Sequence, residues 1–142
     1  MSTALDRIVL AFETLTPASV ETMDVLYAPD ARFKDPFNEV QGLGAIQRIF
    51  RDMFEHTEQP RFVITERIEQ GAQCFLTWEF RFAFKSYQRG QEQCVRGGSH
   101  LVLDNDGRIV MHRDYWDAAE ELYEKLPLIG ALMRWLKRKV AH

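Results

Sequence analysis

The sequence predicts a single α+β domain in which three N-terminal helices pack on a strongly curved, mainly antiparallel sheet. Two observations predict this class. Apolar residues recur at helical spacing up to about residue 54, and after Pro60 they alternate with polar residues, as in strands with one buried face. Helices followed by a run of long strands are typical of α+β proteins, whereas parallel sheets require strands and helices in alternation.

The helices are predicted from three amphipathic segments. Pro17 begins the second helix at a position where proline is favoured, and Pro29 ends it. A short extended segment over 31–35 then stops at Pro36, which cannot continue a strand ladder. The three apolar faces comprise Leu5, Ile8, Val9, Phe12 and Leu15; then Val20, Met23, Leu26 and Tyr27; and finally Ile46, Ile49, Phe50, Met53 and Phe54.

Four long strands are expected after the helices, at 61–69, 74–87, about 92–103 and 108–116. The second has the clearest alternation, with Cys74, Leu76, Trp78, Phe80, Phe82 and Phe84 on one face. The residues at 104–107, Asp-Asn-Asp-Gly, are a strong hairpin signal between the last two strands. The aromatic face of this sheet must be covered, and we expect the three helices to cover it.

His112 and Asp114 lie two residues apart on the last strand, so both side chains point to the same face. If the hairpin loop has two or four residues, the numbers of any two paired residues sum to an odd value. Even-numbered residues of the last strand then lie opposite odd-numbered residues of its partner, so Ser99 shares the face of His112 and Asp114. A three-residue loop would reverse this. The face is otherwise apolar, and Gly97 and Gly98 leave space beside the polar groups. The pair can poise an imidazole for acid or base chemistry, or be a satisfied structural pair.

Composition and charge narrow the possible functions. The formal net charge is -3, which gives no reason to expect a nucleic-acid partner. No segment reaches the length of a membrane span, and charged residues near the start argue against a secretion signal. Cys74 and Cys94 show no disulfide or CxxC spacing, so a reduced, cytoplasmic protein is expected. No spacing typical of metal ligands or of a cofactor motif is present.

Two segments resemble a known superfamily. The sequence YAPDARFKDP at 27–36, followed by GLGAI at 42–46, resembles the opening of the ketosteroid isomerases and, equally, of the SnoaL-like polyketide cyclases. The sequence HRDYWD at 112–117 resembles the last-strand motif of many SnoaL-like proteins. The likeness covers residues 3 to about 117. It implies the cone-shaped fold of the nuclear transport factor 2-like superfamily, with an apolar pocket between sheet and helices.

The resemblance also implies roles for individual residues. Asp35 matches the general-base aspartate of the isomerases, whose pKa is tuned in an apolar pocket so that it can move a proton next to a carbonyl. The alternative is an ordinary turn-forming Asp-Pro pair. Asp114 matches the functional acid or base of the SnoaL-like proteins. The isomerase oxyanion hole does not carry over, because its tyrosine position falls near Ala11 and its aspartate aligns with Ser99.

The sequence therefore predicts a small acid/base enzyme of the isomerase, cyclase or dehydratase type, acting on an apolar, oxygenated small molecule without a cofactor or metal. The alternative is a non-catalytic module of the same fold that binds a small ligand or a partner. The predicted catalytic residues are Asp35, His112 and Asp114. The predicted substrate-binding residues are Tyr27, Phe33, Trp78, Phe80, Phe82, Ser99, Leu101 and Trp116.

Two further expectations concern partners and the end of the chain. A homodimer is expected through the outer sheet face, whose apolar residues are Val63, Phe75, Met111 and Tyr115. A helical extension is expected over about 117–140, with a basic stretch that closes the mouth of the pocket. Contact of this basic helix with an anionic membrane surface is the alternative.

Overall fold

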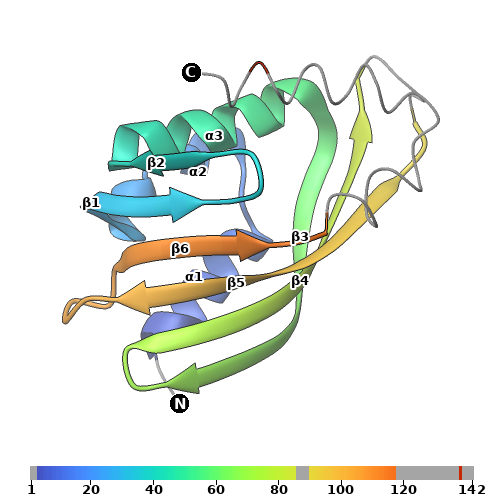
Figure 1. Ribbon diagram of the computed structural model, residues 1–142. Coiled ribbons are helices and arrows are strands. Elements are labelled where there is room, and N and C mark those ends of the chain that lie inside the picture. Colours follow the sequence, from blue (N-terminus) through green and yellow to red (C-terminus); the bar gives the residue numbers. More distant parts are fainter. Residues whose placement is uncertain (1–2, 86–89, 118–137, 139–142) are drawn as a thin grey trace.

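The computed structural model describes residues 3–85, 90–117 and 138. Its helices are α1 (Thr3–Glu13), α2 (Pro17–Val20), the 3-10 helix η1 (Met23–Val25) and α3 (Leu43–His56). Its strands are β1 (Tyr27–Lys34), β2 (Glu39–Gln41), β3 (Thr57–Gln70), β4 (Gln73–Phe84), β5 (Gln93–Leu103) and β6 (Ile109–Tyr115). They form one curved sheet in the order β2-β1-β6-β5-β4-β3, with the helices on one face (Figure 1).

Neighbouring strands of the sheet are antiparallel except β1 and β6, which are parallel. The α+β class and the mainly antiparallel sheet are thus confirmed. Strand β6, the last of the described strands, is inserted between β1 and β5, so the beginning and the end of the described chain meet in the middle of the sheet.

The second predicted helix is wrong in extent. Thr16 caps α2 through reciprocal hydrogen bonds with Ser19, but this helix has only four residues, and Tyr27 already belongs to β1. Tyr27 pairs with Ile109 of β6, whose backbone N–H donates to the carbonyl oxygen of Leu26 at 2.7 Å. Pairing with the last strand outweighs the local helical pattern here.

Strand β3 starts at Thr57, before Pro60. The change from helical to alternating spacing of apolar residues had suggested a start after the proline. The proline is tolerated because β3 is an edge strand, where a missing N–H breaks no ladder. The pairing shifts between Glu58 and Arg61, and Gln59 adopts a φ of 50°, as expected at a bulge. The short strand β2 was not predicted.

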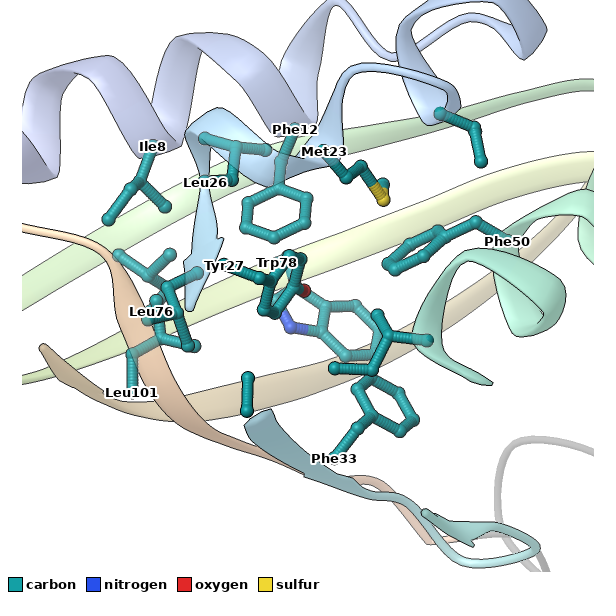
Figure 2. Close-up of a cluster of buried hydrophobic side chains, with 14 of the residues drawn as sticks. Ile8, Phe12, Met23, Leu26, Tyr27, Phe33, Phe50, Leu76, Trp78 and Leu101 are labelled. Atoms are coloured by element: carbon teal, nitrogen blue, oxygen red, sulfur yellow. The ribbon is translucent and has the colours of Figure 1, made fainter. Parts of the chain in front are cut away.

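The hydrophobic core lies between the inner sheet face and the helices (Figure 2). Phe12 of α1 and Phe50 of α3 approach the sheet with their ring centroids 6.3 Å apart. Leu76 of β4 and Leu101 of β5 meet them from the sheet and are at most 1% exposed. The alternation predicted along 74–84 is therefore the alternation of inner and outer faces of β4.

The C-terminal helical extension predicted over about 117–140 lies outside the described residues, apart from 117 and 138. Within the described part of the chain, no helix combines the length and the apolar character needed to cross a membrane.

Candidate active site

The hairpin between β5 and β6 sets which side chains share the inner face. The backbone N–H of Asp104 donates to the carbonyl oxygen of Arg108, so the loop between them has three residues, 105–107, with Gly107 at a φ of 81°. Next to the loop Leu103 pairs with Ile109, so the paired numbers have an even sum there. The register shifts by one residue between Leu103 and Val102, and beyond this bulge Leu101 pairs with His112 and Ser99 with Asp114. Ser99, His112 and Asp114 therefore share one face as predicted, but not for the predicted reason: the loop is odd, which reverses the parity, and the neighbouring β-bulge reverses it back.

The polar side chains on this face form one continuous chain of hydrogen bonds. Nε1 of Trp78 lies 2.8 Å from Oγ of Ser99, which in turn lies 2.5 Å from Oδ1 of Asp114. The same Oδ1 lies 2.6 Å from Nε2 of His112. Nδ1 of His112 lies 2.7 Å from the hydroxyl of Tyr27. Four strands, β1, β4, β5 and β6, thus contribute to a single polar chain within an apolar face.

Asp114 is the member of this chain that is open to the outside. Its side chain is 17% exposed, whereas that of His112 is 4% exposed. Ser99 and His112 both bond Oδ1, and no described residue bonds Oδ2. Because every buried polar side-chain atom in the described part has a partner, Oδ2 is an accessible oxygen. A carboxylate with one anchored and one open oxygen is suited to accept a proton from a bound molecule.

Asp35 lies next to Asp114 but is held separately. Strand β1 ends with Lys34 beside Arg113 of β6, so Asp35 leaves the sheet at the level of Asp114. Its Oδ1 accepts hydrogen bonds from the backbone N–H groups of Phe37, at 2.8 Å, and Asn38, at 2.6 Å. The side-chain amide of Asn38 donates to the same oxygen at 3.1 Å.

Burial raises the pKa of the Asp35 carboxyl, and the charge of Asp114 adds to the rise, although the bonds from Phe37 and Asn38 oppose it. Both readings of Asp35 therefore have support. It forms a turn, as the structural alternative predicted, and it is also a partly desolvated carboxyl close enough to Asp114 to sense its charge.

The predicted substrate-binding residues divide into two sets. Tyr27 and Leu101 are 0% exposed, and their assignment as ligand contacts stays a prediction. Phe33, Trp78, Phe82 and Ser99 are buried, with exposures of 3–6%. Phe80 and Trp116 are partly exposed and remain the most accessible of the predicted set.

The space expected beside Gly97 and Gly98 is occupied. A Cβ at Gly97 would lie 2.6 Å from a ring carbon of Trp78, and a Cβ at Gly98 would lie 2.5 Å from the ring of Phe75. The two glycines therefore accommodate an aromatic ring on each face of β5. The close approach at Gly97 is also what lets the indole of Trp78 lie against the strand that carries Ser99.

Sequence reasoning missed three contributions to the site. Phe37, two residues after Asp35, places its ring 5.4 Å from that of Trp116, two residues after Asp114. Asn38 anchors Asp35, and the Asp-Pro-Phe-Asn order at 35–38 was a usable signal because such residues form hydrogen-bonded turns. The role of Tyr27 had no local signal, because the hydroxyl reaches a residue of the last strand. No three His, Cys, Asp or Glu of the described residues are arranged to hold a metal.

The fold and this inner-face cluster define a member of a class of small α+β proteins with a curved sheet wrapped on helices. The family model of the SnoaL-like domain matches residues 9–112, which is most of the chain. The protein therefore belongs to the SnoaL-like domain family. Comparison with curated proteins gives no significant match.

Solved structures agree with this family. An NTF2-like protein of unknown function from Burkholderia pseudomallei is 20% identical, covers 87% of this chain and 97% of its own, and has a TM-score of 0.72. A putative SnoaL-like polyketide cyclase from Shewanella putrefaciens is 18% identical over 88% and 99%, with a TM-score of 0.70. An LEH-like epoxide hydrolase from M. tuberculosis is 17% identical over 92% of both chains, with a TM-score of 0.68. At these identities the likeness concerns the fold.

Proposed function

We propose that this protein is a cofactor-free acid/base enzyme of the isomerase, cyclase or dehydratase type, acting on an apolar, oxygenated small molecule. Asp114 is the base, through its open Oδ2. His112 orients Asp114, and Asp35 is the second carboxyl at the same opening. The ligand would lie against the partly exposed aromatic rings beside the two carboxyl groups, in a pocket on the inner side of the sheet.

One observation carries this proposal: Oδ1 of Asp114 is held by two donors while Oδ2 is left open. A carboxylate that only stabilised the fold would gain by having both oxygens bonded. Anchoring one oxygen fixes the direction of the other, and a fixed, partly desolvated base is worth about 10²- to 10⁴-fold in rate.

The second carboxyl supports the same chemistry. Burial raises the pKa of the Asp35 carboxyl, while Asp114 receives hydrogen bonds suited to a carboxylate. An acid and a base on one face are the minimum needed to move a proton within a substrate or to expel a hydroxyl group. The fold neighbours named as a putative polyketide cyclase and an epoxide hydrolase agree with a small oxygenated substrate.

Turnover of a panel of apolar ketones, enones, hydroxy-ketones and epoxides tests the proposal, with Asp114→Asn as the inactivating variant. We expect loss of about 10²- to 10⁴-fold in kcat with the fold intact. Asp106→Asn is the matched control, because Asp106 is 78% exposed in the hairpin loop and should leave the rate unchanged. Equal rates for wild type and Asp114→Asn would contradict the assignment of the base.

The binding surface is tested by Phe80→Ala. The ring of Phe80 stacks between those of Phe62 and Phe82, with centroid distances of 4.8 and 4.9 Å, and is still partly exposed. We expect the dissociation constant of an apolar ligand, measured by tryptophan fluorescence quenching, to rise about 10- to 150-fold, because roughly 1.5–3 kcal/mol of apolar contact is lost on removing such a ring. Unchanged affinity would place the pocket elsewhere.

The alternative function is a non-catalytic binding module, and one observation favours it. The carboxyl of Asp35 is turned into its own loop by Phe37 and Asn38, as in a purely structural turn. Under this alternative, ligands bind and quench tryptophan fluorescence but no member of the panel is converted, and Asp114→Asn lowers only the stability of the fold.

The homodimer remains a proposal of the same kind. Val63 and Tyr115 are 39% and 46% exposed on the outer face, whereas Phe75 and Met111 are partly buried there. We propose that a second copy covers this face. Sedimentation should then give twice the mass of 16.6 kDa at micromolar concentration, and Tyr115→Glu should shift it to the monomer. A monomer in both samples would contradict the dimer.

A further inference from the structure

The order of donors and acceptors along the inner-face chain fixes where each hydrogen lies. The indole N–H of Trp78 can only donate, so Oγ of Ser99 accepts from it and directs its own hydrogen to Asp114. A carboxylate only accepts, so Nε2 of His112 carries the hydrogen that meets Oδ1. The hydroxyl of Ser99 and Nε2 of His112 therefore both donate to one oxygen of Asp114.

The far side of His112 follows from this. A neutral imidazole with its hydrogen on Nε2 has a lone pair on Nδ1, and the hydroxyl of Tyr27 lies 2.7 Å from it. In the reverse arrangement Nδ1 would donate to Tyr27, and the hydroxyl hydrogen would need another acceptor. None of the described residues offers one to this hydroxyl, which is fully buried. Tyr27 is therefore the donor at the end of the chain.

The surroundings of His112 reinforce this arrangement. The rings of Phe12 and Phe33 meet it edge-on, with centroid distances of 5.8 and 4.7 Å, and the ring of Tyr27 is nearly parallel to it. Burial, and secondarily the charge of Asp114, raises the pKa of Tyr27 well above its ordinary value, so the hydroxyl keeps its hydrogen. The titratable groups close to His112 are thus Tyr27 and Asp114, one on each ring nitrogen.

We infer that Tyr27 is a positioning residue of the proposed site: its buried hydroxyl donates to Nδ1 of His112 and holds the imidazole neutral, with its hydrogen on Nε2 aimed at Asp114. Asp114 then remains a carboxylate whose Oδ2 meets the substrate. This inference rests on the proposed function for its catalytic meaning, but the direction of the hydrogen bond does not. It assigns Tyr27, which the sequence placed among the ligand contacts, to a place behind the base.

Long-range ¹H–¹⁵N spectra of the ¹⁵N-labelled protein at neutral pH test the direction, because they report which imidazole nitrogen carries hydrogen. Wild type should show His112 neutral, with hydrogen on Nε2 and a hydrogen-bonded lone pair on Nδ1. In Tyr27→Phe the Nδ1 signal should move towards that of a nitrogen without a donor. His100 is the internal control: its Nε2 lies 2.8 Å from Oε1 of Gln73, away from the inner-face chain, so its signals should be the same in both samples.

A wild-type His112 that carries its hydrogen on Nδ1, or is doubly protonated, would overturn the inference. This measurement needs no variant, so it decides even if the substituted chain fails to fold. With a substrate, Tyr27→Phe should lower kcat by at least about tenfold, part of the roughly 10²- to 10⁴-fold worth of a positioned base, and leave KM unchanged. A raised KM with unchanged kcat would instead make Tyr27 a ligand contact. If His112 has the assigned hydrogen but no substrate is converted, only the proposed function fails.

Discussion

The two carboxylates of the site are side by side and are held in opposite ways. Asp114 is anchored by Ser99, 15 residues away, and its chain of bonds continues through His112 to Tyr27, which is 85 residues from His112. Every hydrogen bond to Asp35 comes from residues two or three positions further along the chain. One carboxylate is positioned by the assembled sheet and the other by its own turn.

This difference predicts how far the effect of substituting each aspartate should extend through the structure. The turn at Asp35 needs only a few neighbouring residues, so its effect is local and small. The anchoring of Asp114 needs four strands in register, so any change that disturbs their packing changes the direction of Oδ2 as well. Networks of this kind are worth more than the sum of their pairs, because each bond polarises the next.

The largest loss of activity is expected when both His112 and Asp114 are substituted. If Asp114 and His112 act together, His112→Gln should also cost about 10²- to 10⁴-fold in kcat, and the double change with Asp114→Asn should cost little more than the worse single change. Kinetics on variants with matched circular dichroism provide the measurement. Fully multiplicative losses would show two independent residues and separate His112 from the base.

The next effect concerns the packing that supports the unit. A Cβ at Gly97 would lie 2.6 Å from the Trp78 ring and 2.8 Å from the carbonyl oxygen of Tyr115, so Gly97→Ala forces the backbone or the indole to move. Such overpacking costs about 1–3 kcal/mol of the free energy of unfolding, measured by urea denaturation. Gly44→Ala is the control. It has open space around its Cβ within α3 and should stabilise by up to about 1 kcal/mol. Equal stability for both variants would contradict the close packing of Trp78.

The smallest effect belongs to the local turn. Because the pKa of Asp35 is raised in the folded state, the unfolded chain releases this proton first as pH rises. Its contribution to stability is therefore greatest below the ordinary pKa of an aspartate and declines until the pH exceeds the raised value. Asp35→Asn keeps an oxygen for the turn but cannot ionise, so its free energy of unfolding should exceed that of wild type increasingly across this window. Urea denaturation at several pH values measures the difference, and a constant difference would contradict the raised pKa.

The same contrast explains what the sequence could predict. The pairing of Ser99 with Asp114 was predicted from an even loop, but the loop is odd and the pairing depends on a bulge between Val102 and Leu103 that was not predicted. By contrast, alternation along 74–84 correctly predicted the inner face of β4, and the spacing of His112 and Asp114 correctly predicted their common face. Both are local patterns. The mistaken helix through Tyr27 and the unrecognised role of its hydroxyl share one cause, which is pairing with a strand from the other end of the chain. The space assigned to Gly97 was filled by Trp78, because a missing side chain reveals a close approach but not what approaches.

The insertion of β6 between β1 and β5 has a consequence for synthesis of the protein. Residues 27–34 can pair with β2 as soon as it is made, but their other edge stays unpaired until residues 109–115 have left the ribosome. Closing a parallel pairing across such a sequence separation is slow, since the entropy of the intervening chain is lost before the contact forms. During that interval β1 exposes a strand edge beside an apolar surface, the feature through which nascent chains aggregate or require chaperones. The hydrogen bond between Tyr27 and His112 can therefore form only after β6 has paired with β1.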